Sequence, residues 1–392
     1  MSKVKLNNPK FNLYVNLGGY GGYQIVTKNI LRAIRTHIPN AMDSVNLFKM
    51  QHLQPTDSFV SDWYSNSLKE NTEFKDVSLS ISAFGDALNF HGKKRILYPA
   101  WEGTKIPPDW VAKSKTLDQV WATCTFLRDV YIANGIDPKK VKLVQGGLDT
   151  EEFNIIDNFK SRVLNKTIRR KNGLEVSPEN PYIFLIVGKY EHRKNSRKMV
   201  EAFLKAFEDH PDLNKVKLKM KFSSSVASRS EDAIKADLGP LRTLYPKAFA
   251  RLELIKVHDV DMPLLYNQSD CLIFASSAEG IGLPLLEAMA SGCPTISTSY
   301  ASLKDYVKEG CGLILPDRGQ EDVHDPFYGL NPETMGTWGV VQVDDIKDAL
   351  LEMYNMDPDK RFEMMIRARS HVEQFDFNNT FLQGLKHINE LE

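Results

Sequence analysis

The stretch Cys271-Leu-Ile-Phe-Ala-Ser-Ser-Ala-Glu-Gly-Ile-Gly-Leu-Pro-Leu-Leu-Glu-Ala-Met-Ala-Ser-Gly292 combines a strand, a loop and a helix. Residues 271–275 form an apolar run of the length of a buried strand. Residues 283–290 read as a helix, with Pro284 in the first turn, where its missing N–H is not needed. Because a buried strand that leads into a helix is the building unit of parallel sheets, this stretch predicts an α/β fold.

The rest of the chain repeats this alternation of short apolar runs with longer amphipathic stretches. In the first half the predicted strands are residues 12–16, 44–48, 77–82, 95–98, 119–123 and 141–144. In the second half they are residues 182–187, 216–222, 252–257, 271–274, 294–297 and 312–315, and the tail from about residue 345 has a helical period. A chain of 392 residues is about two domains long. We therefore expect a first Rossmann-like domain at 1–175, a second at 176–370, and a C-terminal helix at 371–392 that packs back on the first.

A polar segment between about Asp149 and Pro181 is interpreted as the linker between these domains. Its basic run Arg169-Arg-Lys171 has no aromatic residues interleaved, which favours a solvated surface over a nucleic-acid site.

The composition is that of an ordinary globular protein. Hydrophobic residues make up 42% and charged residues 26%, and 50 basic residues balance 50 acidic ones. Without a net charge the whole molecule has no general attraction to nucleic acid or anionic lipid, so any anion must be bound by a local cluster. We expect no nucleic-acid partner.

The cysteines and the N-terminus indicate a cytoplasmic protein. Cys124, Cys271, Cys293 and Cys311 form neither metal-type pairs nor a compact disulfide framework. The first residues lack the apolar run of a signal peptide, and the chain has no apolar run long enough for a membrane span. A transmembrane segment is therefore not expected.

Two glutamates flank the start of the helix at 283–290. Glu279 lies just ahead of it and Glu287 about one turn inside, near the carboxyl edge of the sheet, where parallel sheets bind ligands. An acidic residue there could simply complement the helix dipole. However, Glu287 stands in a helix that is apolar nearly all round, where an unpaired carboxylate is costly. Vicinal sugar hydroxyls are suitable donors for it.

The backbone around these glutamates suits a phosphate. A helix N-terminus presents free N–H groups to an anion, and Gly280 and Gly282 leave room for close approach. Lys189, Arg193 and Lys194 follow the predicted strand at 182–187 and so lie at the same sheet edge. They can stabilise a leaving diphosphate, although a solvated basic turn is the alternative.

The segment Glu279-Gly-Ile-Gly-Leu-Pro-Leu-Leu-Glu287, continuing to Pro294, resembles the Glu-x7-Glu signature of the retaining glycosyltransferases of family 4. The likeness extends to Tyr266–Asp270 and to Gly188–Asn195. It covers nearly the whole chain, strongly over residues 182–310. The family has the GT-B fold, in which two Rossmann-like domains face each other across a cleft.

The resemblance implies a hexosyltransferase that acts with retention of configuration, and the basic cluster suggests that it needs no metal ion. The resemblance assigns the donor sugar hydroxyls to Glu279, the nucleotide ribose to Glu287, and the diphosphate to Lys189 with Lys194. Arg193 is added as a donor contact because it belongs to the same basic cluster. Glu279 and Lys194 are then the catalytic residues of the second domain. The remaining donor contacts are expected at Gly18, Gly19, Gly280, Ile281, Gly282 and Leu283.

The acceptor side is less like the family. Gly18 and Gly19 belong to the glycine-rich stretch after the first strand, which lacks the last glycine of a dinucleotide fingerprint. The resemblance implies that this stretch approaches the donor phosphates or the acceptor. Many members carry a histidine in the region of residues 99–107, where Glu102 is the candidate here. Glu102 is the catalytic candidate of the first domain and is expected to orient the acceptor hydroxyl or to contact the donor sugar, unless it merely caps a helix. Trp101 and Trp110 are expected as core residues or as an acceptor platform.

The metal and the donor are less directly encoded in the sequence. Asp259 and Asp261 could form a metal-binding pair, but the helix that starts at Met262 favours capping. We expect no metal and no cofactor other than the donor, with GDP-mannose ahead of UDP-glucose and a glycan or glycoconjugate as acceptor. A nucleotide-sugar 2-epimerase and a non-catalytic nucleotide-sugar binding protein are the alternative functions, and a homodimer stays open.

Overall fold

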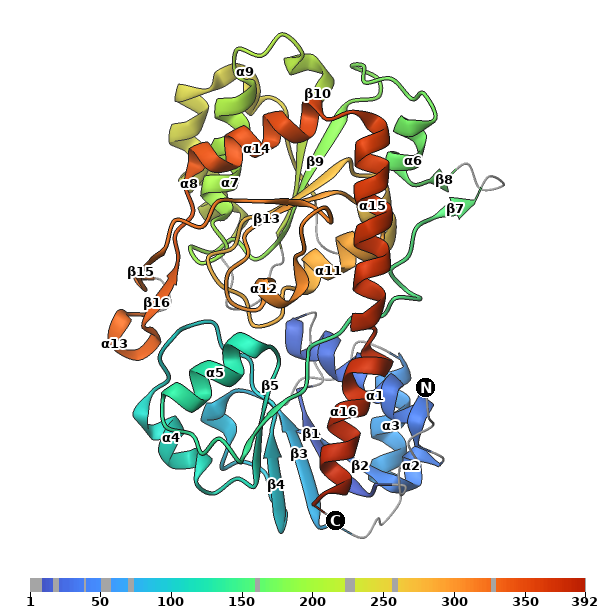
Figure 1. Cartoon of the computed structure of the whole chain (residues 1–392), viewed down its shortest axis with the longest axis vertical. Helices are drawn as coiled ribbons and strands as arrows, with labels where there is room; N and C mark the ends of the chain where they lie inside the picture. Colours follow the sequence, from blue (N-terminus) through green and yellow to red (C-terminus); the bar gives the residue numbers. More distant parts are fainter. Residues whose placement is uncertain are drawn as a thin grey trace. The chain divides into compact units, whose positions relative to one another are not determined.

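The structure is a computed structural model that describes residues 9–16, 21–38, 40–50, 58–69, 74–158, 163–222, 230–255, 260–325 and 329–391. The chain forms two compact units (Figure 1). The first unit comprises Met1–Asp149, Leu330–Thr337 and Gln374–Glu392, and the second comprises Thr150–Gly329 and Trp338–Glu373.

The first unit is built on a six-stranded sheet in the order β2-β1-β3-β4-β5-β6. Its strands are β1 (Phe11–Val15), β2 (Val45–Lys49), β3 (Val77–Ile81), β4 (Lys94–Leu97), β5 (Gln119–Ala122) and β6 (Val141–Leu143). Its helices are α1 (Gly22–His37), α2 (Ala41–Ser44), α3 (Ser58–Lys69), a 3₁₀ helix (Phe84–Asp86), α4 (Pro108–Ser114), α5 (Thr125–Ala133), α13 (Pro332–Met335) and α16 (Phe377–Asn389). Every neighbouring pair of strands is parallel, as the sequence predicts.

The second unit contains a six-stranded sheet in the order β11-β10-β9-β12-β13-β14, also parallel. Its strands are β9 (Tyr182–Gly188), β10 (Val216–Phe222), β11 (Leu252–Leu254), β12 (Cys271–Phe274), β13 (Thr295–Ser297) and β14 (Leu313–Ile314). Its helices are α6 (Lys166–Lys171), α7 (Ser196–Phe207), a 3₁₀ helix (Leu213–Lys215), α8 (Glu231–Leu244), α9 (Pro246–Phe249), α10 (Met262–Asn267), α11 (Leu283–Ala290), α12 (Leu303–Tyr306), α14 (Val343–Asn355) and α15 (Pro358–Val372). Short strands β7 (Asp157–Asn158) and β8 (Val163–Leu164) pair with each other, β15 (Gln320–Asp322) pairs with β16 (Thr337–Gly339), and a 3₁₀ helix (Glu373–Phe375) precedes α16.

The strand pattern follows from burial on each face of the sheets. In β10, alternate residues Val216, Leu218, Met220 and Phe222 are buried in the core of the second unit. The lysines between them point to the opposite face, because side chains alternate along a strand. The predicted strand positions are confirmed in both units, and four buried cysteines, Cys124, Cys271, Cys293 and Cys311, are free thiols.

The last helix of the chain packs in the first unit (Figure 1). Phe377, Phe381, Leu385 and Ile388 of α16 are buried in its core. The ring of Phe381 lies 6.1 Å from that of Trp121, in an edge-on arrangement. Gly384 lets α16 approach closely, since a Cβ there would come within 2.8 Å of the Trp121 ring.

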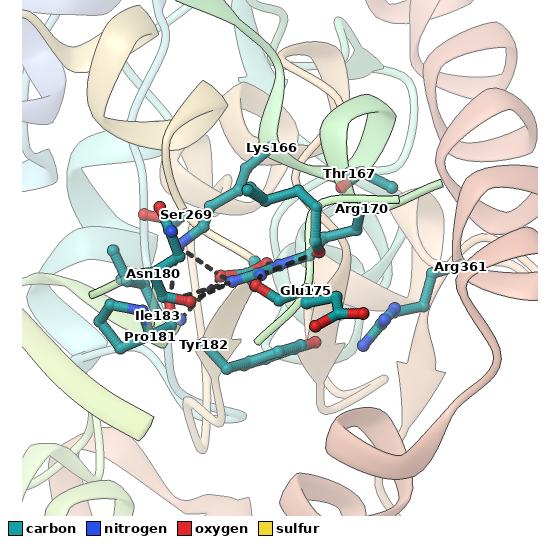
Figure 2. Close-up of polar contacts among 12 residues, drawn as sticks. Lys166, Thr167, Arg170, Glu175, Asn180, Pro181, Tyr182, Ile183, Ser269 and Arg361 are labelled. Carbon is teal, nitrogen blue, oxygen red and sulfur yellow. Dashed lines mark hydrogen bonds and ion pairs between the residues drawn. The ribbon is translucent and has the colours of Figure 1, made fainter. Parts of the chain in front are cut away.

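The polar segment interpreted as a linker is folded onto the second unit instead. Residues 150–175 belong to that unit rather than to the first domain, and α6 lies within them. The Arg170 side chain is buried: its Nε donates to Asp270 Oδ1 at 2.8 Å, and its other donors reach backbone carbonyls of Glu175 and Asn180 (Figure 2).

The expectation that the whole run 169–171 is solvated is therefore wrong for Arg170. A charge can be buried when each of its donors finds an acceptor, and here the acceptors include a carboxylate about a hundred residues away. Lys166 Nζ lies 2.8 Å from the other oxygen of Asp270. Figure 2 shows Lys166 and Arg170 converging beside Tyr182.

Candidate functional site

The loop between β12 and α11 carries the first predicted site residues. Helix α11 has the predicted bounds, with Pro284 in its first turn. Gly282 precedes it with φ of 87°, a left-handed conformation that favours glycine. A Cβ on Gly282 would lie 2.5 Å from Leu303 Cδ2. Glycine at 282 is therefore required by the start of the helix and by its packing, whether or not a ligand approaches.

The neighbouring loop residues are held inside the second unit. Gly280 and Leu283 are buried, and the carbonyl of Ile281 accepts a hydrogen bond from Ser302 Oγ at 3.0 Å. The backbone around Glu279 is thus fixed by the segment that follows β13.

Glu279 forms a buried ion-pair cluster with two predicted site residues. Its residue exposure is 4%. Lys194 Nζ lies 2.5 Å from Oε1, and Arg193 Nη1 lies 3.3 Å from Oε2. Burial alone would raise the pKa of Glu279, but the charges of Lys194 and Arg193 outweigh it and hold the pKa below its usual value. Glu279 is therefore a carboxylate at neutral pH.

Lys194 experiences the opposite balance. Burial lowers the pKa of its ammonium group, the charge of Arg193 adds to this effect, and Glu279 opposes it. The ammonium also lies 5.5 Å from the centroid of the Phe274 ring.

A second carboxylate, Glu191, completes this cluster. Its Oε1 lies 3.4 Å from Lys189 Nζ and its Oε2 lies 3.3 Å from Arg193 Nη2. Glu191 is not among the residues predicted from the sequence. The sequence feature that could have identified Glu191 is its position in the same basic loop, two residues from both Lys189 and Arg193.

The loops after β9 and β12 are joined by hydrogen bonds, because these strands are neighbours in the sheet. Asn195, at the start of α7, donates from Nδ2 to the Ala275 carbonyl at 2.9 Å and to Ser277 Oγ at 2.8 Å. Ser277 N–H donates to the Arg193 carbonyl at 2.8 Å, and Arg193 Nη1 donates to the Ala278 carbonyl at 2.6 Å. These bonds explain why residues about 85 positions apart in sequence form one cluster.

Glu287 lies on α11 and is 6% exposed. The hydroxyl of Tyr266, from α10, donates to Glu287 Oε2 at 2.8 Å. Burial raises the pKa of Tyr266, and the charge of Glu287 raises it further. Burial lowers the pKa of Lys221, and the charge of Glu287 opposes that shift. Tyr266 lies in the segment Tyr266–Asp270 that resembles the glycosyltransferase family, but its hydrogen bond to Glu287 was not predicted from the sequence.

Glu102 belongs to the first unit, in the loop that follows β4. Glu102 is half-buried. Burial raises the pKa of Tyr23, and the negative charge of Glu102 raises it further. The hydrogen bond that the Tyr23 hydroxyl oxygen accepts from the Ala100 N–H opposes this rise. Gly18 and Gly19 lie outside the described residues.

The Glu102 loop is packed against residues 330–337 of the same unit. A Cβ on Gly103 would come 2.2 Å from the Met335 carbonyl, and Lys105 N–H donates to that carbonyl at 3.0 Å. Trp101 and Trp110 form an edge-on pair with ring centroids 4.4 Å apart.

Asp261 caps α10, as the sequence predicts. Its side chain accepts a hydrogen bond from Leu264 N–H at 3.0 Å. Asp259 lies outside the described residues. In the part of the chain that the structure describes, no group of three or more His, Cys, Asp or Glu side chains is arranged to hold a metal ion. Within the same part, no helix is both long and apolar enough to cross a membrane.

Comparison with known proteins bears on the segment that contains Glu279 and Glu287. Residues 254–326 match the family described as "Glycosyl transferases group 1". The match covers less than a fifth of the chain, so it shows a likeness of this segment to the family. An uncharacterized glycosyltransferase of Methanocaldococcus jannaschii is 25% identical over 204 residues, which are 52% of this chain and 45% of the relative. The O-antigen chain mannosyltransferase B of Escherichia coli is 40% identical over 58 residues, 15% of each protein.

The match therefore spans less than half the length of these curated relatives. The fold as a whole is similar to that of HepE of Anabaena, solved in complex with UDP and glucose. The two structures share 14% identity and a TM-score of 0.66, over 97% of this chain and 100% of the other. The chain has the GT-B fold, and the predicted α/β class with parallel sheets in two Rossmann-like domains is confirmed.

The segment that matches the family model supplies only part of the site. Glu279 and Glu287 lie within residues 254–326, whereas Lys189, Arg193 and Lys194 lie outside. The geometry joins them, because Glu279 pairs with two of these cations. The second unit thus combines a basic cluster suited to a diphosphate with a buried carboxylate suited to hydroxyls.

Proposed function

We propose that this protein is a retaining glycosyltransferase that transfers a hexose from a nucleoside diphosphate sugar to an acceptor hydroxyl on a glycan or glycoconjugate. The observation that supports it most is the position of Glu279 between Lys194 and Arg193, with Glu287 on the helix that follows. These groups come from the carboxyl ends of β9 and β12, where open parallel sheets bind ligands.

Each residue has a distinct role in this proposal. Glu287 accepts hydrogen bonds from the ribose hydroxyls, and Glu279 accepts them from the donor sugar. Lys189, Arg193 and Lys194 bind the diphosphate and stabilise the charge that develops as the glycosidic bond breaks. The leaving phosphate takes the proton of the acceptor hydroxyl, so the reaction needs no separate protein base in the second unit.

The backbone of the second unit completes the proposed donor site. Gly280, Ile281, Gly282 and Leu283 line the phosphates. In the first unit, Gly18 and Gly19 are proposed as contacts of the donor phosphates or of the acceptor, and Glu102 as a contact of the acceptor or of the donor sugar. The cations replace a metal ion, so activity should persist in excess EDTA and should not increase with added Mn²⁺.

GDP-mannose is the donor that we propose first, supported by the likeness to a mannosyltransferase. A UDP-sugar is the second candidate, because HepE was solved with UDP and glucose. Calorimetry with GDP-mannose, UDP-glucose and their nucleoside diphosphates tests this choice. Tight binding of UDP-sugars alone would exclude the first donor.

Incubation with a labelled donor tests the reaction. A glycosyltransferase yields a glycoside or slowly hydrolysed sugar, an epimerase yields the epimeric donor, and a binding protein returns the donor unchanged. Nuclear magnetic resonance of the product shows whether the anomeric configuration is kept, and inversion would contradict the retaining mechanism.

A further inference from the structure

The basic cluster of the second unit contains more negative charge than a diphosphate site requires. Three cations, Lys189, Arg193 and Lys194, are paired with two carboxylates, Glu191 and Glu279. Three against two leaves one net positive charge among these side chains. The proposed function already uses Glu279 for the donor sugar, but it leaves Glu191 without a role.

Glu191 is placed to act on the cations rather than on solvent. Its side chain is 6% exposed, and its two oxygens face Lys189 and Arg193. Ser196 Oγ accepts a hydrogen bond from the Glu191 N–H at 3.4 Å and donates to the Lys189 carbonyl at 3.0 Å. The start of α7 therefore holds the backbone that leads into this carboxylate, from Lys189 to Glu191.

A buried carboxylate in this position stays near the cations when a ligand binds. Charges that are largely buried are weakly screened by salt, so a bound diphosphate experiences both the attraction of the cations and the repulsion of the carboxylate. The repulsion grows with the negative charge of the ligand.

We propose that Glu191 is an affinity-setting residue, which weakens the binding of the nucleoside diphosphate so that the product leaves after transfer. This inference rests on the proposed function, because it requires a diphosphate at Lys189, Arg193 and Lys194. In this proposal Glu191 sets the rate at which the nucleoside diphosphate product is released, and it takes no part in the transfer of the sugar.

The test is Glu191→Gln, which removes the charge and keeps a side chain of the same shape. Calorimetry with a nucleoside, its monophosphate and its diphosphate should give affinity gains that rise in this order. We expect no gain for the nucleoside and about tenfold tighter binding of the diphosphate. Inhibition of turnover by the product diphosphate should become stronger by a similar factor.

Glu201→Gln is the matched control, since Glu201 pairs with Arg197 on the partly exposed face of α7. It should leave all three affinities unchanged. Glu191→Ser is a second neutral variant that buries no amide, and it should give the same order of gains. Glu191→Asp keeps the charge and should bind the diphosphate within about threefold of the wild type.

Two outcomes would contradict the proposal in different ways. If the wild type prefers the diphosphate over the nucleoside but both neutral variants bind it equally or more weakly, Glu191 only holds the cations in place, and the proposed function stands. If the wild type itself shows no preference for the diphosphate, both the inference and the proposed diphosphate site are wrong.

Discussion

Single residues of the second unit are held by specific partners, and this decides how a substitution will act. Glu287 is buried and accepts a hydrogen bond from Tyr266, whereas Glu279 is held by two cations. Removing either carboxylate therefore changes both a partner in the protein and a proposed ligand contact. Experiments at this scale must separate folding from binding.

Glu287→Gln should weaken binding of the donor by about 10- to 150-fold, because hydrogen bonds to a charged group contribute about 1.5–3 kcal/mol. The fold should remain intact, since glutamine still accepts the Tyr266 hydroxyl. Calorimetry and circular dichroism measure the two effects. Unchanged donor affinity together with a lower melting temperature would identify Glu287 as a structural residue.

Lys194→Ala should reduce kcat more than donor affinity, because its charge is most important when the phosphate leaves. The variant also removes one ion pair of Glu279 and keeps the pair with Arg193, so stability must be measured alongside. Equal losses in binding and in kcat/KM, with kcat unchanged, would make Lys194 an anchor only. Lys198→Ala is a control on the next helix, where the ammonium donates to the Val341 carbonyl.

At the scale of elements, the second unit depends on α6 as well as on its sheet. Arg170 from α6 pairs with Asp270, which precedes β12 and also accepts from the Ile183 N–H of β9 at 2.8 Å. One carboxylate therefore connects a helix to two neighbouring strands. The same strands carry the loops of the proposed site, so α6 supports the site from the amino end of the sheet.

Arg170→Met should destabilise the protein by about 3–5 kcal/mol, because it breaks a buried pair and leaves carbonyl acceptors without their donor. Arg169→Met is the matched control, one position earlier on the exposed side of α6, and should change stability by about 0.5 kcal/mol or less. Chemical denaturation of both variants measures the difference. Equal effects would show that the buried pair contributes nothing specific.

At the scale of the whole molecule, each unit is assembled from segments that are not continuous in the sequence. The first unit takes its sheet from the N-terminal half, α13 from residues 330–337 and α16 from the C-terminus. Each unit has its own buried core. A core substitution near the C-terminus is therefore expected to destabilise the unit that contains the N-terminus.

Phe381→Ala should cost the first unit about 3–5 kcal/mol, because it empties a site against Trp121. Hydrogen exchange followed by mass spectrometry should show faster exchange in β1 to β6 and no change in β9 to β14. Leu350→Ala, in the core of the second unit, should give the reverse pattern. Faster exchange in both sheets from either variant would mean that the two units unfold together.

Much of this architecture is readable from the sequence, since strands, helices and their ends depend on neighbouring residues. The apolar runs predicted every strand of the two parallel sheets, and the stretch 271–292 predicted α11. The cap at Asp261 followed from a similar local pattern. Parallel strands also bring their carboxyl ends to one edge, so the grouping of Lys194 with Glu279 was a sound expectation.

Only the tertiary structure decided the partners of the buried charges. From the sequence alone, the basic run that contains Arg170 looks like any solvent-exposed run. Its burial becomes clear only when the fold brings Asp270, about a hundred residues away, to its side chain. The ion pair of Glu191 with Arg193 and the hydrogen bond of Tyr266 to Glu287 are likewise visible only in the three-dimensional structure. The physical reason is that periodicity records which face of an element is buried, whereas an ion pair or hydrogen bond depends on where a distant segment of the chain packs.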